Sequence, residues 1–186
     1  QWQDITDQLA AEQEERNRIE AERIVASENA RIRVALDNVT TNVMLADNDR
    51  NIIYMNKNAT SLFTDNQDEI RSQLPNFDPD SLIGTNIDGF HENPSHQVGL
   101  LNNLNSTFES ELLIGSLTMK IIATPVISDE GERLGTAVEW GDRTQEVAVE
   151  KEIDELVEAA SQGNLVSRID LANKQGFFKQ LGQGIN

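Results

Sequence analysis

The sequence predicts an α+β protein: a five-stranded antiparallel sheet with helices on one face, flanked by N- and C-terminal helices. Short apolar runs follow one another in the order strand, strand, short helices, longer helix and three strands. In the last three runs apolar residues alternate with charged ones, which is the period of a strand with one buried face. Residues 1–38 contain neither Gly nor Pro and favour helix, so the sheet is expected to begin after them.

The N-terminal segment, residues 1–38, is rich in Gln, Glu and Arg and is predicted to be a linker helix. Its apolar residues on one heptad seam are Ile5, Leu9, Ile19, Ala26 and Ala30. Glu12, Arg16 and Arg23 fall on the same seam, so a weak coiled coil and a solvated helix are both open alternatives. Near the end of the segment an apolar face predicts packing on the following domain, through Ile32, Leu36 and Val39.

The first half of the sheet is predicted at residues 43–46 and 52–55, because both runs are apolar and a polar turn separates them. Asn56 can then cap a short helix. The apolar residues of that helix are Ala59, Leu62 and Phe63. Residues 64–81 are polar with two prolines, so we expect a loop or short irregular helices there.

The second half of the sheet is predicted at residues 107–114, 117–127 and 133–141, with a hairpin turn at 129–132. Charged side chains mark its outer face at Glu109, Glu111, Lys120 and Glu139. Alternation sends the other set to the inner face, namely Leu112, Met119, Ile121, Leu134, Val138 and Trp140.

The C-terminal part returns to helix beyond Asp142. The apolar stripe of that helix is Ile153, Leu156, Val157 and Ala160. Residues 163–164 can end the helix, residues 165–171 read as an irregular connector, and Gly176 begins another helix. The chain is therefore divided into an N-terminal helix (1–38), a central domain (39–144) and an output helix with a further segment (145–186).

Composition excludes several classes of partner and chemistry. The net charge of −17 and the pI near 4.3 argue against binding to nucleic acid or to an anionic membrane. No apolar run reaches the length of a membrane span, and no signal peptide is visible. The chain starts with Gln1 and stops within a helical pattern, so we expect a piece of a longer protein. The lack of cysteine excludes disulfides, thiolate ligands, covalent c-type haem and cysteinyl–flavin chemistry, and it fits a cytoplasmic setting.

Both histidines of the chain lie within residues 90–97. Asn93-Pro94 between them is a helix-start signal, which puts His91 in the preceding turn and His96 in the first helical turn. Apolar residues follow at helical spacing, at Val98, Leu100, Leu101 and Leu104. The pattern fits a metal or haem site beside an apolar wall, and it equally fits two surface histidines.

No catalytic set is visible, so we expect a protein that is not an enzyme. The sequence contains no nucleophile elbow, no Gly-rich phosphate loop and no clustered His/Asp metal site. Asp47, Asp49 and Asn51 superficially resemble a calcium loop, but the downstream Gly and Glu are missing, which favours a solvated turn.

Two motifs, in this order, resemble a PAS domain of a bacterial chemoreceptor. Asn48-x3-Ile52-x-Tyr54-x-Asn56 is similar to the second strand and following helix of that family, and Asp142-Arg143-Thr144 is similar to its Asp-x-Thr junction. The resemblance spans about Arg31 to Thr144. It implies a PAS fold and a role in chemotaxis signal transduction, in which the junction couples the last strand to an output helix.

Residues 158–186 resemble the beginning of a HAMP domain, a parallel four-helix bundle of dimeric receptors. The matching residues are Glu158-Ala159-Ala160-x2-Gly163-Asn164-Leu165-x2-Arg168-Ile169 and Gly176-Phe177-Phe178-x2-Leu181-x3-Ile185-Asn186. The resemblance implies a homodimer that passes its signal to HAMP and chemoreceptor signalling domains, with the second HAMP helix truncated here.

The run Phe90-His91-x-Asn93-Pro94-x-His96-Gln97, with Trp140 in the last strand, resembles the haem-binding PAS domain of soluble aerotaxis-type receptors, which are methyl-accepting chemotaxis proteins. The resemblance implies that His91 is the axial ligand of the iron, with His96 as the second candidate. It also implies Trp140 as a distal hydrogen-bond donor and Ile121 as a pocket wall, where the family usually has Leu. The expected ligand is oxygen or another diatomic gas.

A b-type haem (iron protoporphyrin IX) needs one imidazole and an apolar slot that hides the macrocycle. The apolar lining available for it is Leu100, Leu101, Leu104, Leu112, Met119, Ile121 and Val138. The same residues can instead fill the core of a cofactor-free PAS interaction module, with Trp140 as a core aromatic. A PAS domain that binds flavin or a small metabolite is a third alternative.

Overall fold

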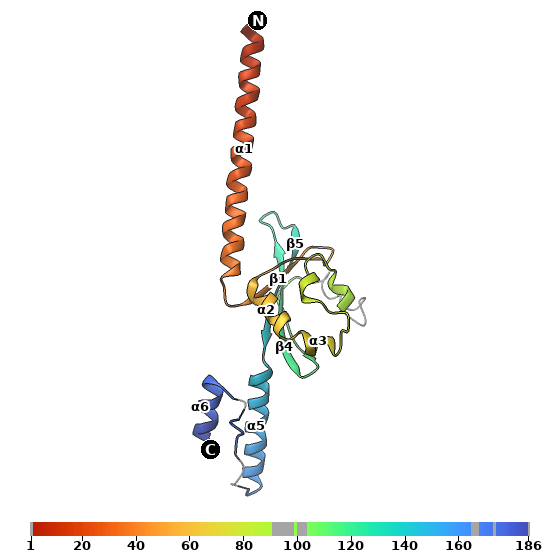
Figure 1. Cartoon of the computed structure of the whole chain (residues 1–186), viewed down its shortest axis with the longest axis vertical. Coiled ribbons are helices and arrows are strands. Elements are labelled where there is room, and N and C mark those ends of the chain that lie inside the picture. The colour runs from red at the N-terminus through yellow and green to blue at the C-terminus, as the bar shows by residue number, and fades with distance from the viewer. Residues whose placement is uncertain (1, 91–98, 100–103, 165–167, 173, 186) are drawn as a thin grey trace.

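The computed structural model describes residues 2–90, 99, 104–164, 168–172 and 174–185 (Figure 1). Its helices are α1 (Trp2–Asp37), α2 (Lys57–Asp65), α3 (Gln67–Arg71), α5 (Thr144–Ser161) and α6 (Gly176–Ile185), with short 3-10 turns η1 (Pro79–Ser81) and η2 (Ile87–Phe90). Its strands are β1 (Asn42–Ala46), β2 (Ile52–Met55), β3 (Phe108–Ile114), β4 (Leu117–Ile127) and β5 (Arg133–Asp142). The longer helix expected after Asn93-Pro94 falls mostly outside the described residues.

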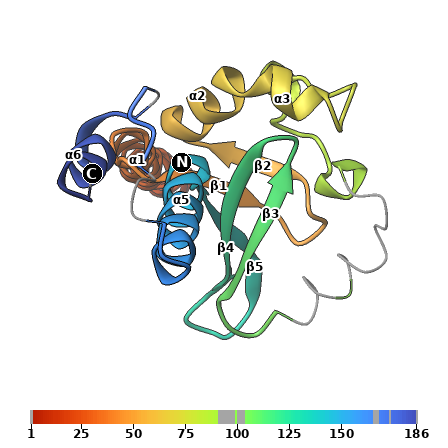
Figure 2. The same ribbon diagram turned by 90° about the horizontal axis from the view of Figure 1, so that it is seen from below.

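The strands form one antiparallel sheet in the order β2-β1-β5-β4-β3. Helices α2 and α3 lie on one side of it (Figure 2). Asn56 caps α2 as expected, because its side chain accepts a hydrogen bond from Ala59 N. The helix then buries Ala59 and Phe63 against the sheet. The predicted α+β fold, with a five-stranded antiparallel sheet and helices on one face, is confirmed.

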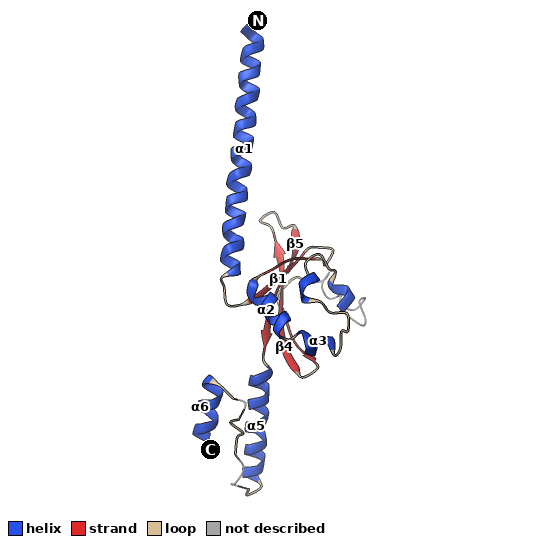
Figure 3. Ribbon diagram, in the orientation of Figure 1, coloured by secondary structure: helices blue, strands red, loops and turns tan. Residues whose placement is uncertain are grey.

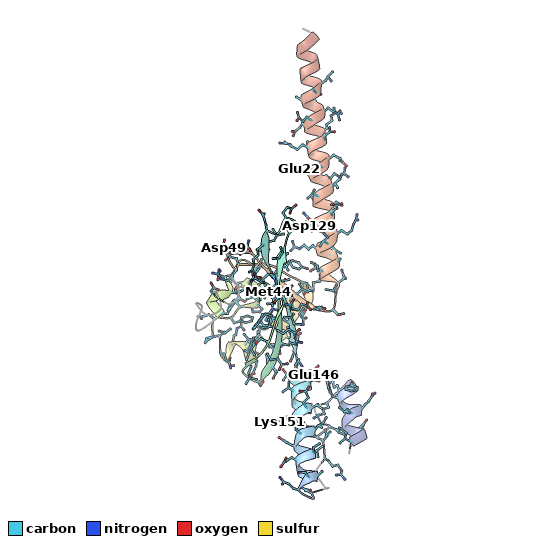
Figure 4. The ribbon with its side chains drawn as sticks, turned by 180° about the vertical axis from the view of Figure 1, so that it is seen from behind. Glu22, Met44, Asp49, Asp129, Glu146 and Lys151 are labelled. Atoms are coloured by element: carbon cyan, nitrogen blue, oxygen red, sulfur yellow. The ribbon has the colours of Figure 1, made fainter. Side chains whose placement is uncertain are left out.

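The two faces of the sheet follow the predicted alternation. Met44 of β1, which lies within the central domain (Figure 4), pairs with Val138, and Met119 pairs with Leu112, so each pair shares one face. Met44 and Met119 are buried in the main apolar cluster, against which Leu112 and Val138 pack. On the opposite face Lys120 pairs with Glu109 through an ion pair of 2.9 Å.

The prediction for Leu134 is wrong, because this side chain is 55% exposed. The register shifts between Val126 and Ile127, so that Gly135 pairs with Val126 while Arg133 pairs with Ile127. Leu134 is the extra residue of this bulge and leaves the inner face. Gly135 has a positive φ of 149°, and a Cβ there would lie 2.2 Å from Ala46 O, so the bulge requires glycine.

Helix α1 contacts the sheet through polar groups and not through the apolar face that the sequence predicts. Ile32 and Val39 are exposed, and Leu36 is only half-buried. The contacts come instead from Tyr54 on β2. Its hydroxyl donates to Asp37 Oδ1 at 2.8 Å, and its ring lies 5.6 Å from the Arg33 guanidinium carbon. The described rest of α1 projects away from the sheet, on the side opposite to α5 (Figure 3).

Tyr54 gives a direct pH test of this contact, because it is the sole tyrosine of the chain. Burial, followed by the hydrogen bond to Asp37, raises its pKa to about 12. In the unfolded chain a tyrosine titrates near about 10. The phenol therefore contributes stability that is fully present below about pH 10 and is lost as the pH rises from about 10 to about 12.

We expect the phenolate absorbance of the folded protein to rise with a midpoint of about 12. We also expect the unfolding temperature to fall more steeply with pH above about 10 in the wild type than in Tyr54→Phe. The protein in denaturant is the control. A folded-state midpoint equal to the midpoint in denaturant would show that the phenol is neither buried nor bonded to Asp37.

The C-terminal segment folds back along α5. Lys174 Nζ forms an ion pair with Glu152 at 2.7 and 2.8 Å, which holds the connector against the helix. Of the predicted apolar stripe, Ile153 and Leu156 are half-buried, whereas Val157 is 64% exposed. Within the described ranges, no helix has the length and apolar character needed to cross a membrane.

Candidate functional site

The inner face of the sheet is the candidate functional site, because most of the described residues predicted to line a pocket lie on it. Ile121 pairs with Trp140, and Leu112 pairs with Met119, which is only 1% exposed. Val138 packs between the main cluster and a second apolar cluster that contains Leu104. Leu104 reaches this second cluster from the segment that precedes β3, and it is buried there. His91, His96, Leu100 and Leu101 lie outside the described residues.

Trp140 carries the one buried side-chain polar atom without a hydrogen-bond partner in the part of the chain that the structure describes. That atom is the indole Nε1, which can only donate. Leaving a buried donor unpaired costs roughly 1–3 kcal/mol, and such donors are rare in native proteins. The unpaired indole N–H therefore needs a physical reason. A ligand with an acceptor atom on this face is one such explanation.

An aromatic row connects Trp140 with the turn that precedes the histidines. The Trp140 ring meets Phe63 of α2 edge-on, with centroids 5.1 Å apart. Phe63 lies 6.0 Å from Phe77, and Phe77 lies 6.1 Å from Phe90, the last residue of η2. Such tilted pairs are preferred geometries for aromatic rings. The sheet face and the entrance to the histidine segment are thus in contact through one continuous set of rings.

Phe63, Phe77 and Phe90 were not predicted as site residues. For Phe63 the sequence predicted burial but not a role in the site, because the residue lies on the apolar face of the helix that Asn56 caps. Phe77 lies in a stretch that reads as loop, and no local period assigns it to the inner face. Their grouping is a long-range packing effect between residues 63, 77, 90 and 140.

The end of β5 is joined to both α5 and β4 by the Asp142-Arg143-Thr144 motif. Asp142 Oδ1 accepts hydrogen bonds from Thr144 N at 2.9 Å and from Thr144 Oγ1 at 2.5 Å. Thr144 Oγ1 accepts a hydrogen bond from Thr118 N at 3.0 Å, and Arg143 N donates to Thr118 O at 2.8 Å. The first turn of α5, which begins four residues after Trp140, is therefore fixed to β4.

Charged groups extend this junction across the outer face. The Arg143 guanidinium pairs with Glu111 of β3 and, at 2.8 Å, with Glu150 of α5. The hydrogen bond to Glu111 is the largest cause that raises the pKa of Arg143.

In the described part of the chain, no group of three or more His, Cys, Asp or Glu side chains could hold a metal ion. In the Asp47 turn, hydrogen bonds from the Asn51 backbone and side chain lower the pKa of the Asp47 carboxyl.

Comparison with known proteins identifies the central domain. A family model described as PAS domain matches residues 30–94. The methyl-accepting chemotaxis protein McpB of Pseudomonas aeruginosa is 48% identical over 166 residues, which are 89% of this chain. The chain spans only 24% of the length of that relative.

Solved structures agree with the family match. The structure titled "The Aer2 Receptor from Vibrio cholerae is a Dual PAS-Heme Oxygen Sensor" is 35% identical, with a TM-score of 0.52. The match covers 55% of this chain and 94% of that one. An RNA-binding Light-Oxygen-Voltage receptor shares the fold at 14% identity with a TM-score of 0.50, covering 76% of this chain and 40% of that one. The five-stranded sheet, the family match and the 35% identical structure together show that the chain belongs to the PAS domain family.

Proposed function

We propose that this PAS domain binds b-type haem, senses oxygen or another diatomic gas, and relays the signal through α5 to a HAMP and chemoreceptor module. The observation that carries the proposal is the buried, unpaired indole N–H of Trp140 on an apolar sheet face. The 35% identical Aer2 receptor from Vibrio cholerae, which is described as a dual PAS-heme oxygen sensor, supports it. The similarity to McpB supports the chemoreceptor context.

The described residues fit a haem on two counts. The inner face offers apolar side chains that exclude water from a macrocycle, chiefly Met119, Ile121 and Val138. The indole N–H supplies a donor for which the described part of the protein offers no acceptor. The haem, when bound, supplies the iron that takes up the gas. His91 would hold the iron, and His96 is the second candidate.

In this proposal Trp140 converts gas binding into a change in the sheet. Its N–H would donate a hydrogen bond to the bound gas, and its ring would move relative to Phe63, 5.1 Å away. The strand that carries Trp140 ends at Asp142, whose carboxylate holds the first turn of α5 through Thr144. A small shift of β5 would thereby reach α5. We further propose that the protein acts as a cytoplasmic homodimer, that it binds neither nucleic acid nor membrane, and that it catalyses no reaction.

The absorption spectrum of the full chain, reconstituted with haem, tests the proposal. We expect a sharp Soret band for the ferric protein, a five-coordinate ferrous spectrum after reduction, and a reversible change when oxygen or carbon monoxide is added. A broad band like that of free haem, with no saturable 1:1 binding, would reject haem as the cofactor.

Replacing the histidines separately tests the ligand assignment. We expect His91→Ala to abolish the Soret band, because the iron loses its protein ligand, while His96→Ala retains it. Added imidazole should restore the band in His91→Ala if the pocket itself is intact. Loss of haem from His96→Ala alone would transfer the ligand role to His96.

The aromatic row favours one alternative, a cofactor-free PAS interaction module. In that case Phe63 and Phe77 pack next to Trp140 as core aromatics, and the indole N–H stays without an acceptor among the described residues. A colourless protein that binds neither haem nor flavin on titration, and is still dimeric by light scattering, would support this alternative.

A further inference from the structure

The turn η2 is clamped to the β1–β2 turn immediately before the histidine segment. Arg50 Nε donates hydrogen bonds to Asp88 Oδ1 and Oδ2, both at 3.0 Å, and Arg50 Nη2 donates to Oδ2 at 2.9 Å. Both side chains are only 22% exposed. The hydrogen bond to Asp88 raises the pKa of Arg50, so the guanidinium keeps its charge. The pair is a planar fork that restrains direction as well as distance.

The backbone next to the pair is joined as well. Ile87 N donates to Arg50 O at 3.0 Å, and Asn86 Nδ2 donates to Asp49 O at 2.8 Å. Arg50 itself has a φ of 68°, a left-handed conformation that is uncommon for residues other than Gly, Asn and Asp. The turn therefore holds an arginine in a backbone conformation that favours other residues. This indicates that the pairing of the guanidinium with Asp88 matters at this position.

The opposite side of η2 is fixed by apolar contacts. Ile87 packs against both apolar clusters of the inner face, and Phe90 packs on Phe77. The turn is thus fixed on its outer side by Asp88 and on its inner side by Ile87 and Phe90. His91 follows Phe90 directly in the sequence, so the position and direction of the Phe90 backbone set where the His91 backbone begins.

We infer that Arg50 and Asp88 are a positioning pair that sets the geometry of the axial histidine through η2. The inference rests on the proposed haem function with His91 as ligand, and it assigns a role to two residues outside the inner face. Groups that orient a metal ligand without touching the metal typically change its affinity by about 10–100-fold when they are removed. Loss of the pair frees the outer side of η2 while leaving its backbone hydrogen bonds and apolar contacts in place.

The test compares three variants of the haem-loaded full chain, Arg50→Gln, Asp88→Asn and the double variant. The matched control is Lys120→Gln, which removes the 2.9 Å ion pair with Glu109 on the outer face of the sheet. Resonance Raman spectra of the ferrous protein report the iron–histidine stretching band, and transfer of haem to apomyoglobin reports the rate of haem loss. Thermal unfolding of the haem-free proteins reports stability separately.

We expect haem loss to be about tenfold faster in both single variants, with a shifted or broadened iron–histidine band. The double variant should lose haem no faster than the faster single variant, because the two side chains act as one unit. Lys120→Gln should match the wild type. An unchanged band and an unchanged rate in the single variants would overturn the inference. A lowered unfolding temperature with an unchanged band would also overturn it, since the pair would then serve the fold alone. A wild type that binds no haem would instead reject the proposed function.

Discussion

Trp140→Phe is expected to release oxygen from the haem-loaded protein about 5- to 100-fold faster than the wild type, with haem content unchanged. The indole N–H is buried without an acceptor among the described residues and can only donate. A hydrogen bond to a partly charged ligand is worth roughly 1–3 kcal/mol, and about 1.4 kcal/mol corresponds to tenfold. Stopped-flow dissociation of oxygen measures the rate, and the ratio of Soret to protein absorbance measures haem content.

Phe at position 140 keeps an aromatic ring next to Phe63 and removes only the donor. Trp140→Leu removes the ring as well and is expected to weaken oxygen binding or speed autoxidation of the iron. Phe63→Leu is the matched control, since it loses the 5.1 Å ring contact and leaves the indole N–H in place. An oxygen dissociation rate unchanged in both Trp140 variants would remove this residue from gas sensing and leave it as a core aromatic.

Asn56→Ala is expected to lower the free energy of unfolding by about 3 kcal/mol, because the substitution leaves several buried backbone groups unpaired. The Asn56 side chain is fully buried at the corner where α1, β1 and α2 meet. Its Oδ1 accepts from Val43 N at 3.0 Å and from Ala59 N at 2.9 Å. Its Nδ2 donates to Leu36 O at 3.0 Å and to Thr41 O at 2.8 Å. Urea unfolding followed by circular dichroism measures the change.

Asn58→Ala is the control for this loss. The Asn58 side chain donates to Val39 O at 2.9 Å, but the bond is exposed, so water can replace it. We expect a change within about 0.5 kcal/mol for this variant. Equal losses in the Asn56 and Asn58 variants would show that burial of the Asn56 amide is not what stabilises the corner.

The sheet could be predicted from the sequence because each strand carries its own signal. Alternation of Glu109 and Glu111 with apolar residues determines which face is buried, and the structure keeps that parity up to the end of β4. The parity failed at Leu134, where a bulge inserts one residue. A bulge depends on the pairing of two strands, and neither strand alone encodes it.

The candidate site was predictable only in part, for the same reason. Ile121 and Trp140 could be placed on one face by counting along their strands, and the register pairs them. The approach of Phe77 to Phe63 could not be predicted, because it depends on how an irregular segment packs over the sheet. The packing of α1 was also mistaken: its apolar residues suggested burial, yet Tyr54 and Asp37 form the contact.

The length of helix α1 determines how its two ends are rotated relative to each other. Its 36 residues extend over about 54 Å at 1.5 Å per residue, and the described side-chain contacts from Tyr54 and Asn56 join its C-terminal end to the domain. With 3.6 residues in each turn, one inserted residue rotates the far end by about 100° relative to the sheet. The number of residues in α1 therefore determines the rotation of its N-terminal end about the helix axis, relative to the sheet. A torque applied at Trp2 would reach β2 through two hydrogen-bonded side chains at the base of the helix.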